Sequence, residues 1–159
     1  MKRVLFVCTG NICRSPTAEG IFRKLVLDAG LTDHIESDSA GTHDYHVGEA
    51  PDPRTQAAAL ARGYDLSQLR ARQVGRSDME RFDLILAMDR SHHAYLARLA
   101  PASGRGKLRM MLEYARGAGI LDVPDPYYGG PGGFEQVLDM LEDASRGLLE
   151  ALRADTPRG

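Results

Sequence analysis

Two kinds of apolar pattern alternate along this chain: short unbroken apolar runs, and longer stretches in which apolar residues recur every three to four positions. Residues 4–7 read Val-Leu-Phe-Val, which is typical of a strand buried on both faces of a parallel sheet. A second buried run lies at 83–88, and weaker strand patterns lie at 34–40 and 108–112. These runs predict four strands.

Helical periodicity fills the stretches between the strands. Ser15-Pro16 predicts the start of the first helix, because serine caps helices and proline has no N–H group to leave unpaired, and Gly30 predicts its end. Its apolar face holds Ala18, Ile21, Phe22, Leu25 and Ala29, while Glu19, Arg23, Lys24 and Asp28 fall elsewhere. Further helices are predicted from Asp52-Pro53 to near Gly63, at 77–80, at 90–99 and from Phe134 to Leu152.

Strands that alternate with helices predict the α/β fold class, with a parallel sheet, helices on both faces and right-handed crossovers. The length of 159 residues suits one domain, which we expect to span residues 1–154, and residues 155–159 are expected to form a disordered C-terminal tail. The Pro- and Gly-rich segment 122–133 is predicted to be a loop. In such sheets ligands bind beyond the carboxyl ends of the strands.

Composition narrows the functional classes. A net charge of −2 gives no electrostatic reason to expect nucleic acid or an anionic membrane as a partner. The two cysteines lie close together in one loop and form no disulfide framework, which favours a reducing compartment. Met1-Lys2-Arg3 is followed by only four apolar residues, fewer than a signal peptide needs, and no later run could span a bilayer. We therefore expect a cytoplasmic protein.

The segment after the first strand carries the strongest chemical signal. Cys8 ends the strand, Gly10 and Asn11 tolerate left-handed backbone angles, and Arg14 precedes the helix. A loop ahead of a helix N-terminus directs backbone N–H groups inward and makes a cradle for a dianion such as phosphate. Arg14 can add a bidentate contact, and the positive surroundings favour Cys8 as a thiolate that Ser15 supports with a hydrogen bond.

The alternative interpretation of this loop is structural. A lone cysteine is usually a small buried hydrophobe, and a Cys-x5-Arg spacing occurs by chance in many chains. The apolar strand before the loop, the Gly and Asn within it and the amphipathic helix after it favour a functional cysteine. The loop is therefore predicted to hold a nucleophile inside an anion site.

Hydrolysis of a phosphate ester also needs a proton donor for the leaving oxygen. Asp125 is the best candidate, because Pro124 and Pro126 stiffen the backbone on either side. A turn aspartate before proline is common, so this prediction depends on the cysteine loop. Asp122 and Asp89 are the competing carboxylates, and Asp89 could instead cap the next helix or tether a loop.

Aromatic residues and histidines complete the candidates. Tyr127 and Tyr128 are predicted as walls of a pocket for an aromatic substrate, with Tyr45 as a weaker candidate for the opposite wall. His43 and His46 have a spacing that could suit a metal, but they lack supporting ligands, so a surface loop is predicted and no metal or cofactor is expected. His92-His93 is predicted to lie on a solvated helix face.

The chain resembles the low-molecular-weight protein tyrosine phosphatases. The matching motifs are Val7 to Pro16, which reads Val-Cys-Thr-Gly-Asn-Ile-Cys-Arg-Ser-Pro, and Asp125 to Gly129, which reads Asp-Pro-Tyr-Tyr-Gly. Shorter matches are Ser39 to Thr42, Ala71 to Gln73, and Met88-Asp89. The resemblance covers about residues 3–152 and implies a four-stranded parallel sheet and metal-independent hydrolysis through a phosphocysteine intermediate.

Position by position, the resemblance implies roles for the motif residues. Cys8 matches the nucleophile, Arg14 the phosphate clamp, and Asp125 the residue that acts as acid and then as base. The phosphate-binding loop would comprise Thr9, Gly10, Asn11, Ile12, Cys13, Arg14 and Ser15, and the substrate pocket Thr9, Ile12, Tyr45, Tyr127 and Tyr128. Thr9 replaces the Leu of some members, and residues 129–133 are richer in glycine than expected, which affects the rim and peptide preference but not the chemistry.

This resemblance implies phosphotyrosine-containing proteins as substrates. We expect a monomer, an expectation that does not come from the resemblance. Three alternatives stay open. Phosphoarginine phosphatases are relatives that tend to carry Thr where Ile12 stands and lack the double tyrosine. Arsenate reduction would need two further cysteines after Cys13, and the chain has none. A non-catalytic phosphate-binding module is the third.

Because a thiolate and a neutral acid must coexist, we expect a bell-shaped rate profile with its maximum at mildly acidic pH.

Cys13 has a structural and a redox interpretation. It can pack inside the loop, or it can trap an oxidised Cys8 as a disulfide and so protect the nucleophile from irreversible oxidation. We adopt the second as the hypothesis to test.

Overall fold

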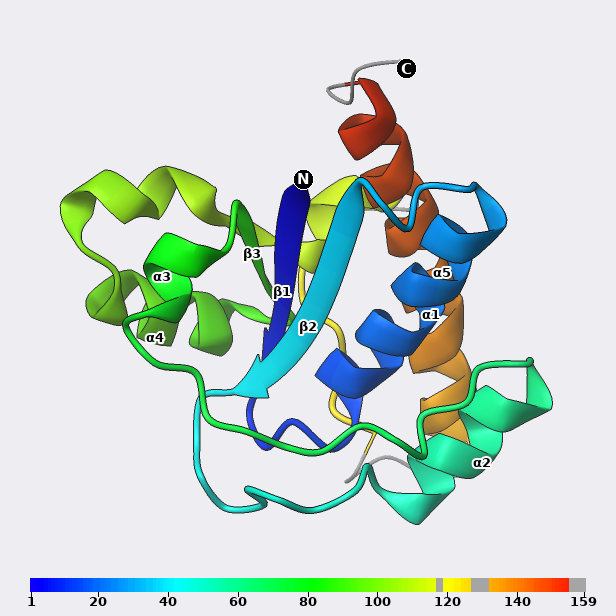
Figure 1. Cartoon of the computed structure of the whole chain (residues 1–159). Coiled ribbons are helices and arrows are strands. Elements are labelled where there is room, and N and C mark those ends of the chain that lie inside the picture. The colour runs from blue at the N-terminus through cyan, green and yellow to red at the C-terminus, as the bar shows by residue number, and fades with distance from the viewer. Residues whose placement is uncertain (117–118, 127–131, 155–159) are drawn as a thin grey trace.

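Four parallel strands form one sheet, in the order β2-β1-β3-β4. The computed structural model describes residues 1–116, 119–126 and 132–154. The strands are β1 (Lys2–Cys8), β2 (Ile35–Gly41), β3 (Leu84–Ala87) and β4 (Leu108–Met110). β1 is central and pairs with both β2 and β3, and their carboxyl ends lie at the lower end of the molecule in Figure 1. The predicted α/β class with a four-stranded parallel sheet is confirmed.

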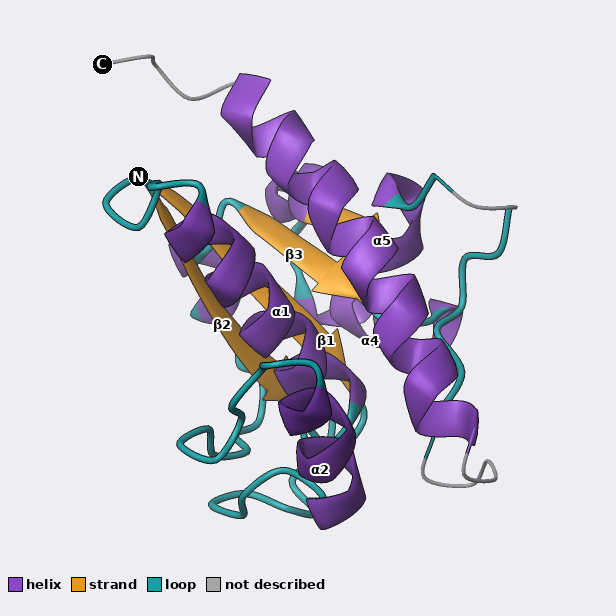
Figure 2. Ribbon diagram, turned by 90° about the vertical axis from the view of Figure 1, so that its right-hand side faces the viewer, coloured by secondary structure: helices purple, strands orange, loops and turns teal. Residues whose placement is uncertain are grey.

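Helices cover both faces of this sheet. They are α1 (Arg14–Asp28), α2 (Pro53–Ala61), α3 (Asp78–Arg81), α4 (Arg90–Leu99) and α5 (Gly132–Ala154), with 3-10 turns η1 (Ala102–Lys107) and η2 (Met111–Tyr114). α1 and α5 pack side by side on one face, as Figure 2 shows, while α3 and α4 lie on the other. α2 begins where predicted, because the Asp52 carboxylate accepts hydrogen bonds from the N–H groups of Arg54 and Thr55.

The apolar run of β1 divides its side chains between two cores. Val4 and Phe6 face α1 and α5, and the Phe6 ring meets that of Phe22 edge-on, with centroids 5.7 Å apart. Leu5 and Val7 face the other way, toward the cluster beneath α3 and α4. Because all four side chains are fully buried, the unbroken apolar run is explained by burial on both faces.

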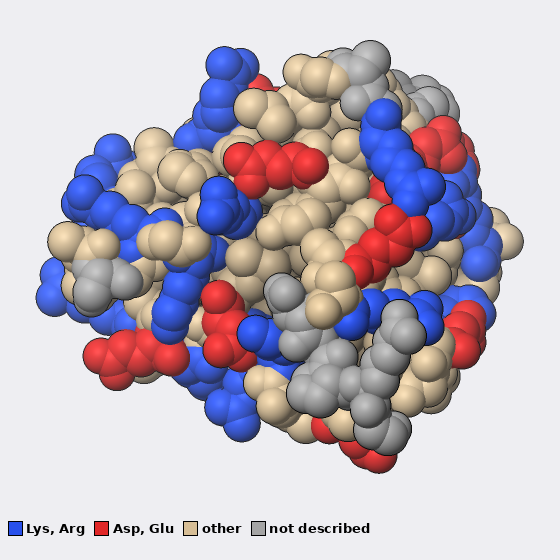
Figure 3. Space-filling model, turned by 90° about the horizontal axis from the view of Figure 1, so that it is seen from above, with Lys and Arg blue, Asp and Glu red and all other residues tan. Residues whose placement is uncertain are grey.

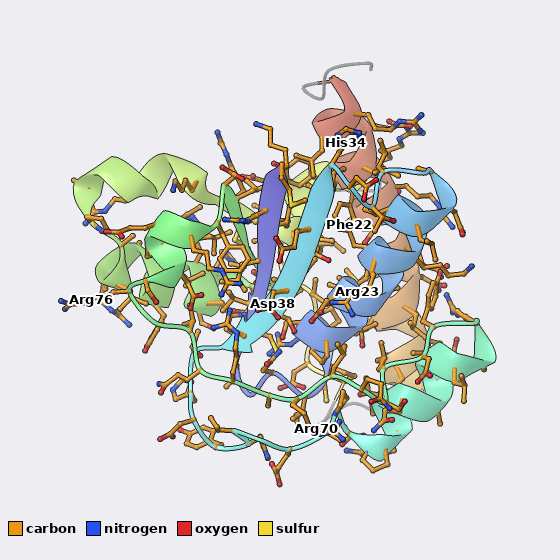
Figure 4. All side chains as sticks on the ribbon, viewed as in Figure 1. Phe22, Arg23, His34, Asp38, Arg70 and Arg76 are labelled. Carbon is orange, nitrogen blue, oxygen red and sulfur yellow. The ribbon has the colours of Figure 1, made fainter. Side chains whose placement is uncertain are left out.

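The first helix departs from its sequence prediction in two ways. It begins at Arg14, so Ser15 lies in its first turn and its hydroxyl does not cap the helix. Glu19, predicted away from the buried face, is only 2% exposed and is enclosed where β2 and the adjoining loops cover the first turns of α1. Phe22 is buried and Arg23 exposed as predicted, and both are labelled in Figure 4.

Smaller differences concern the later elements. The fourth strand ends at Met110 and continues as η2, and η1 had no sequence prediction. The predicted tail, residues 155–159, lies outside the described residues, so that boundary stays a prediction.

The remaining surface fits the balanced composition. Seen from above, at the amino ends of the strands, Lys and Arg side chains alternate with Asp and Glu, and neither sign covers the face (Figure 3). Over the described part of the chain, each helix is too short or too polar to span a bilayer.

Gly147 provides a test of the packing of α5. A Cβ atom at this position would overlap the backbone carbonyl oxygen of Tyr114 in η2. We expect Gly147→Ala to lower the free energy of unfolding by about 2 kcal/mol, since the overlap outweighs the gain of about 1 kcal/mol in helix propensity. Denaturant unfolding measures the change.

Gly20→Ala in α1 is the matched control, because its Cβ would meet only the Leu66 Cδ2 methyl group, the movable end of a side chain. A smaller loss is expected there. Equal losses at Gly20 and Gly147 would contradict the role assigned to the Tyr114 backbone.

Candidate active site

A cavity of about 170 Å³ opens at the carboxyl end of β1, where the sheet topology predicts a ligand site. The first loop of the chain, which joins β1 to α1, lies at the lower end of the molecule in Figure 1. The cavity is lined by Cys8, Thr9, Gly10, Ile12, Cys13, Arg14, Tyr45, His46 and Asp125. Residues that are more than a hundred positions apart in the sequence therefore share one pocket.

Three backbone carbonyls of the loop are bonded to the segment that follows β2. Those of Cys8, Thr9 and Ile12 accept hydrogen bonds from the N–H groups of Thr42, His43 and Asp52, at 2.8, 3.0 and 2.9 Å. Among the described residues, no backbone carbonyl accepts from the N–H groups of residues 10–13. Such a run of N–H groups ahead of a helix N-terminus is the arrangement that binds tetrahedral oxyanions.

Asn11 fixes the turn of the loop. Its φ of 59° is left-handed, a conformation that asparagine tolerates better than most residues. The side chain amide donates to the hydroxyls of Ser15 and Ser39, at 2.8 and 3.0 Å, and its oxygen accepts from the N–H of Arg72, at 3.0 Å. Arg72 is paired in turn with Asp38 of β2, labelled in Figure 4. Three segments of the chain therefore hold Asn11.

Cys8 lies at the floor of the cavity and is 2% exposed. Its Sγ is 3.0 Å from the hydroxyl oxygen of Ser15. Because that oxygen already accepts a hydrogen bond from Asn11, the Ser15 proton is available for the sulfur. The Ser15 hydroxyl therefore contacts the Cys8 sulfur instead of capping α1.

Arg14 reaches the cavity with a nearly buried guanidinium. Its Nη1 donates to the Asp89 carboxylate at 2.9 Å and to the carbonyl of Val123 at 3.0 Å. Its Nη2 lies on the cavity side, 3.5 Å from the Thr9 hydroxyl and 3.7 Å from the Asp125 carboxylate. One edge of the guanidinium is anchored and the other faces the space above Cys8.

Asp89 has both of the roles that the sequence left open. It caps α4 by accepting from the N–H of His92, and it tethers Arg14. Burial opposes its charge, but the hydrogen bonds from Ser91, His92 and Arg14 outweigh burial and lower the pKa of Asp89. Asp122 pairs instead with Arg90, at 2.9 Å.

The other predicted site residues fall into three groups. Thr9, Ile12 and Tyr45 line the cavity as expected, and the Tyr45 ring stacks on that of His43 at 5.0 Å. Tyr127 and Tyr128 lie outside the described residues. Cys13, at the end of the loop, also lines the cavity but is 6% exposed, and burial raises the pKa of its thiol to about 12, so it is protonated at neutral pH.

The family model described as low molecular weight phosphotyrosine protein phosphatase matches residues 3–158. The chain belongs to that family. The prediction of the family and of its enzyme class, a protein tyrosine phosphatase, is confirmed.

Individual relatives agree over the whole length. The low molecular weight protein-tyrosine-phosphatase of Streptomyces coelicolor is 53% identical over 154 residues, which cover 95% of this chain and 93% of that protein. A crystal structure of a protein tyrosine phosphatase from Entamoeba histolytica matches with a TM-score of 0.94 and 39% identity, covering 98% of this chain and 99% of that one. The structure of YfkJ from Bacillus subtilis matches with a TM-score of 0.93 and 38% identity, covering 99% and 98%.

Two histidines at or beside the cavity were not predicted from the sequence. His92, predicted on a solvated face, is 2% exposed and its Nε2 lies 2.7 Å from the Thr9 hydroxyl. His46 lines the cavity and packs against Gly10, where a Cβ atom would come within 2.9 Å of its ring. His46 also pairs with Glu49, and the described residues contain no cluster of three metal-ligating side chains. The position of His92 three residues after Asp89, as in a capping box, was a usable signal.

The buried His92 makes stability depend on pH. Burial and the charge of Arg14 lower the pKa of His92 from 6.5 to about 4. Between these values the unfolded chain binds a proton that the folded one does not, so stability falls as the pH falls through this window. The slope from this group reaches about 1.4 kcal/mol per pH unit, or about 3 kcal/mol in all.

Denaturant unfolding at several pH values between 7 and 4 tests this expectation. His92→Gln should flatten the slope between pH 6.5 and 4, while His93→Gln on the same helix should keep it. An unchanged slope in His92→Gln would contradict the assignment.

Proposed function

We propose that this chain hydrolyses phosphotyrosine in proteins, and small aryl phosphates, through a phosphocysteine intermediate on Cys8. The observation that carries the proposal is the single cavity that Cys8, Arg14 and Asp125 share above a run of inward-facing N–H groups. The names of the relatives support the same substrate class.

The first step assigned to this site is attack on phosphorus. The Cys8 thiolate, supported by the Ser15 hydroxyl, displaces the phenolate oxygen in line, and the phosphorus–oxygen bond breaks as the sulfur–phosphorus bond forms. Arg14 Nη2 and the loop N–H groups hold the three remaining phosphoryl oxygens. Cys13 does not compete as the nucleophile, because its buried thiol keeps its proton.

Asp125 is assigned to both proton transfers. It gives a proton to the leaving phenolate and, as a carboxylate, takes one from the water that hydrolyses the phosphocysteine. Its place on the cavity wall, 3.7 Å from Arg14 Nη2, supports this role. The requirement for a thiolate beside a protonated acid supports the mildly acidic rate maximum.

Peptide substrates test the proposed function. We expect a higher kcat/KM for phosphotyrosine peptides than for phosphoarginine peptides of the same sequence, and no turnover with Cys8→Ser. A preference for phosphoarginine would favour that alternative activity. Binding of phosphate without any hydrolysis would favour a non-catalytic module.

Asp125→Asn tests whether Asp125 donates the proton to the leaving group. The test uses kcat/KM, which reports only the steps up to release of the phenol and not the later hydrolysis of the phosphocysteine. With phenyl phosphate, whose leaving group needs the proton, kcat/KM should fall by about 10²- to 10⁴-fold, and with p-nitrophenyl phosphate, whose leaving group is better, by much less. Asp122→Asn, three residues earlier and paired with Arg90, is the control and should keep its kcat/KM. Equal losses for the two substrates would remove Asp125 from this role.

We also propose that Cys13 protects Cys8. Peroxide converts the Cys8 thiolate to a sulfenic acid, and condensation with the Cys13 thiol forms a disulfide and releases water. Both side chains line the same cavity. After peroxide and then a thiol reductant, the parent should recover its activity and Cys13→Ser should recover less. Equal recovery would refute the protection.

A further inference from the structure

One buried side chain beside the site has no part in the mechanism above. His92 lies in the first turn of α4, in a different part of the fold from the catalytic loop, yet its imidazole reaches that loop and contacts Thr9. Its neighbour His93 is half-buried and has no such contact. In a neutral imidazole one ring nitrogen donates a hydrogen bond and the other accepts one. The groups around His92 define which nitrogen does which.

The tautomer of His92 follows from its second contact. The backbone N–H of Asp89 donates to Nδ1 at 3.2 Å. Asp89 Oδ1 also lies 3.2 Å from Nδ1, but this oxygen accepts from the Ser91 hydroxyl and from the backbone N–H of His92. A backbone N–H can only donate, so Nδ1 accepts and the ring proton of the neutral imidazole is on Nε2. Nε2 therefore donates to the Thr9 hydroxyl oxygen, 2.7 Å away.

With both acceptor positions of its oxygen used, the Thr9 hydroxyl can form a further hydrogen bond only by donating its proton. Its oxygen accepts from His92 and, at the longer distance of 3.5 Å, from Arg14 Nη2. A hydroxyl has two acceptor positions and one donor, so with both lone pairs directed at these N–H groups the proton points elsewhere. The Thr9 carbonyl is bonded to the N–H of His43, which holds the backbone, and Thr9 lines the cavity.

We propose that His92 is a positioning residue of the site: by donating to Thr9, it turns the Thr9 hydroxyl proton toward an oxyanion held above Cys8. The Thr9 side chain then adds one hydrogen bond to those of the loop N–H groups and Arg14. This inference rests on the proposed function for its oxyanion, but its test can be separated from hydrolysis.

A double-mutant cycle on Thr9 and His92 tests the coupling. The affinities of inorganic phosphate and of orthovanadate are measured by calorimetry for the parent, Thr9→Val, His92→Leu and the double variant. We expect each single substitution to weaken vanadate binding by about tenfold, the effect of one hydrogen bond to a charged group, and the double variant to be weakened no further. The kcat/KM for p-nitrophenyl phosphate should follow the same pattern.

Two variants separate positioning from folding. His92→Gln keeps an N–H donor near the Nε2 position and should recover part of the affinity that His92→Leu loses, which a purely structural role would not predict. If His92→Leu does not fold, His92→Met, which also lacks an N–H donor, takes its place in the cycle. His93→Leu is the control on the same helix and should bind vanadate like the parent.

The inference is overturned if the affinity losses of the two single variants multiply in the double variant. It is also overturned if His92→Leu binds vanadate like the parent, or if His92→Gln binds it no better than His92→Leu. A parent that binds phosphate without hydrolysing any ester would refute the proposed function and leave the binding cycle to decide this inference. A parent that binds neither oxyanion would refute both.

Discussion

The buried ion pair between Arg14 and Asp89 is the interaction on which the site depends. The guanidinium is 5% exposed, and a charge so deeply placed is tolerated only when it is paired and hydrogen-bonded. Asp89 supplies one partner at 2.9 Å and the carbonyl of Val123 another at 3.0 Å. The pair joins the end of β3 to the start of α1, so the two halves of the sheet position one guanidinium.

The loop around Cys8 is also held in place by hydrogen bonds to its buried polar groups. Its carbonyls are bonded to the segment that follows β2, and Asn11 is bonded on three sides. Gly41 lets these segments approach, since a Cβ there would lie 2.6 Å from the Thr9 carbonyl oxygen. Because the carbonyls of Cys8, Thr9 and Ile12 are engaged elsewhere, the proposed binding of an anion by the loop N–H groups would need little reorganisation.

Much of this could be predicted from the sequence, because buried parallel strands are unbroken apolar runs and because the chemistry of the loop is local. Cys8, Asn11 and Arg14 are close in the chain, so their grouping needed no knowledge of the fold. Glu19 and His92 were wrongly predicted for one reason. Helical periodicity places a side chain relative to its own helix, whereas loops from elsewhere cover the first turns of α1 and α4. Asp125 joins the cavity across more than a hundred residues, and it was found from the sequence through the chemistry that Cys8 requires and through the Asp-Pro-Tyr-Tyr-Gly motif of the family.

The pairing of Arg14 also determines where the attraction for an anion comes from. Arg14 and Asp89 together carry no net charge, and Asp125 adds a carboxylate 3.7 Å from the same guanidinium. On the proposed function, a dianion above Cys8 would therefore not be held by free positive charge. It would be held by fixed dipoles: the N–H groups of residues 10–13, the N-terminus of α1 and the edge of the guanidinium that faces the cavity. Such a site would need no basic surface around it, so a net charge of −2 is compatible with the proposed binding of a phosphate ester.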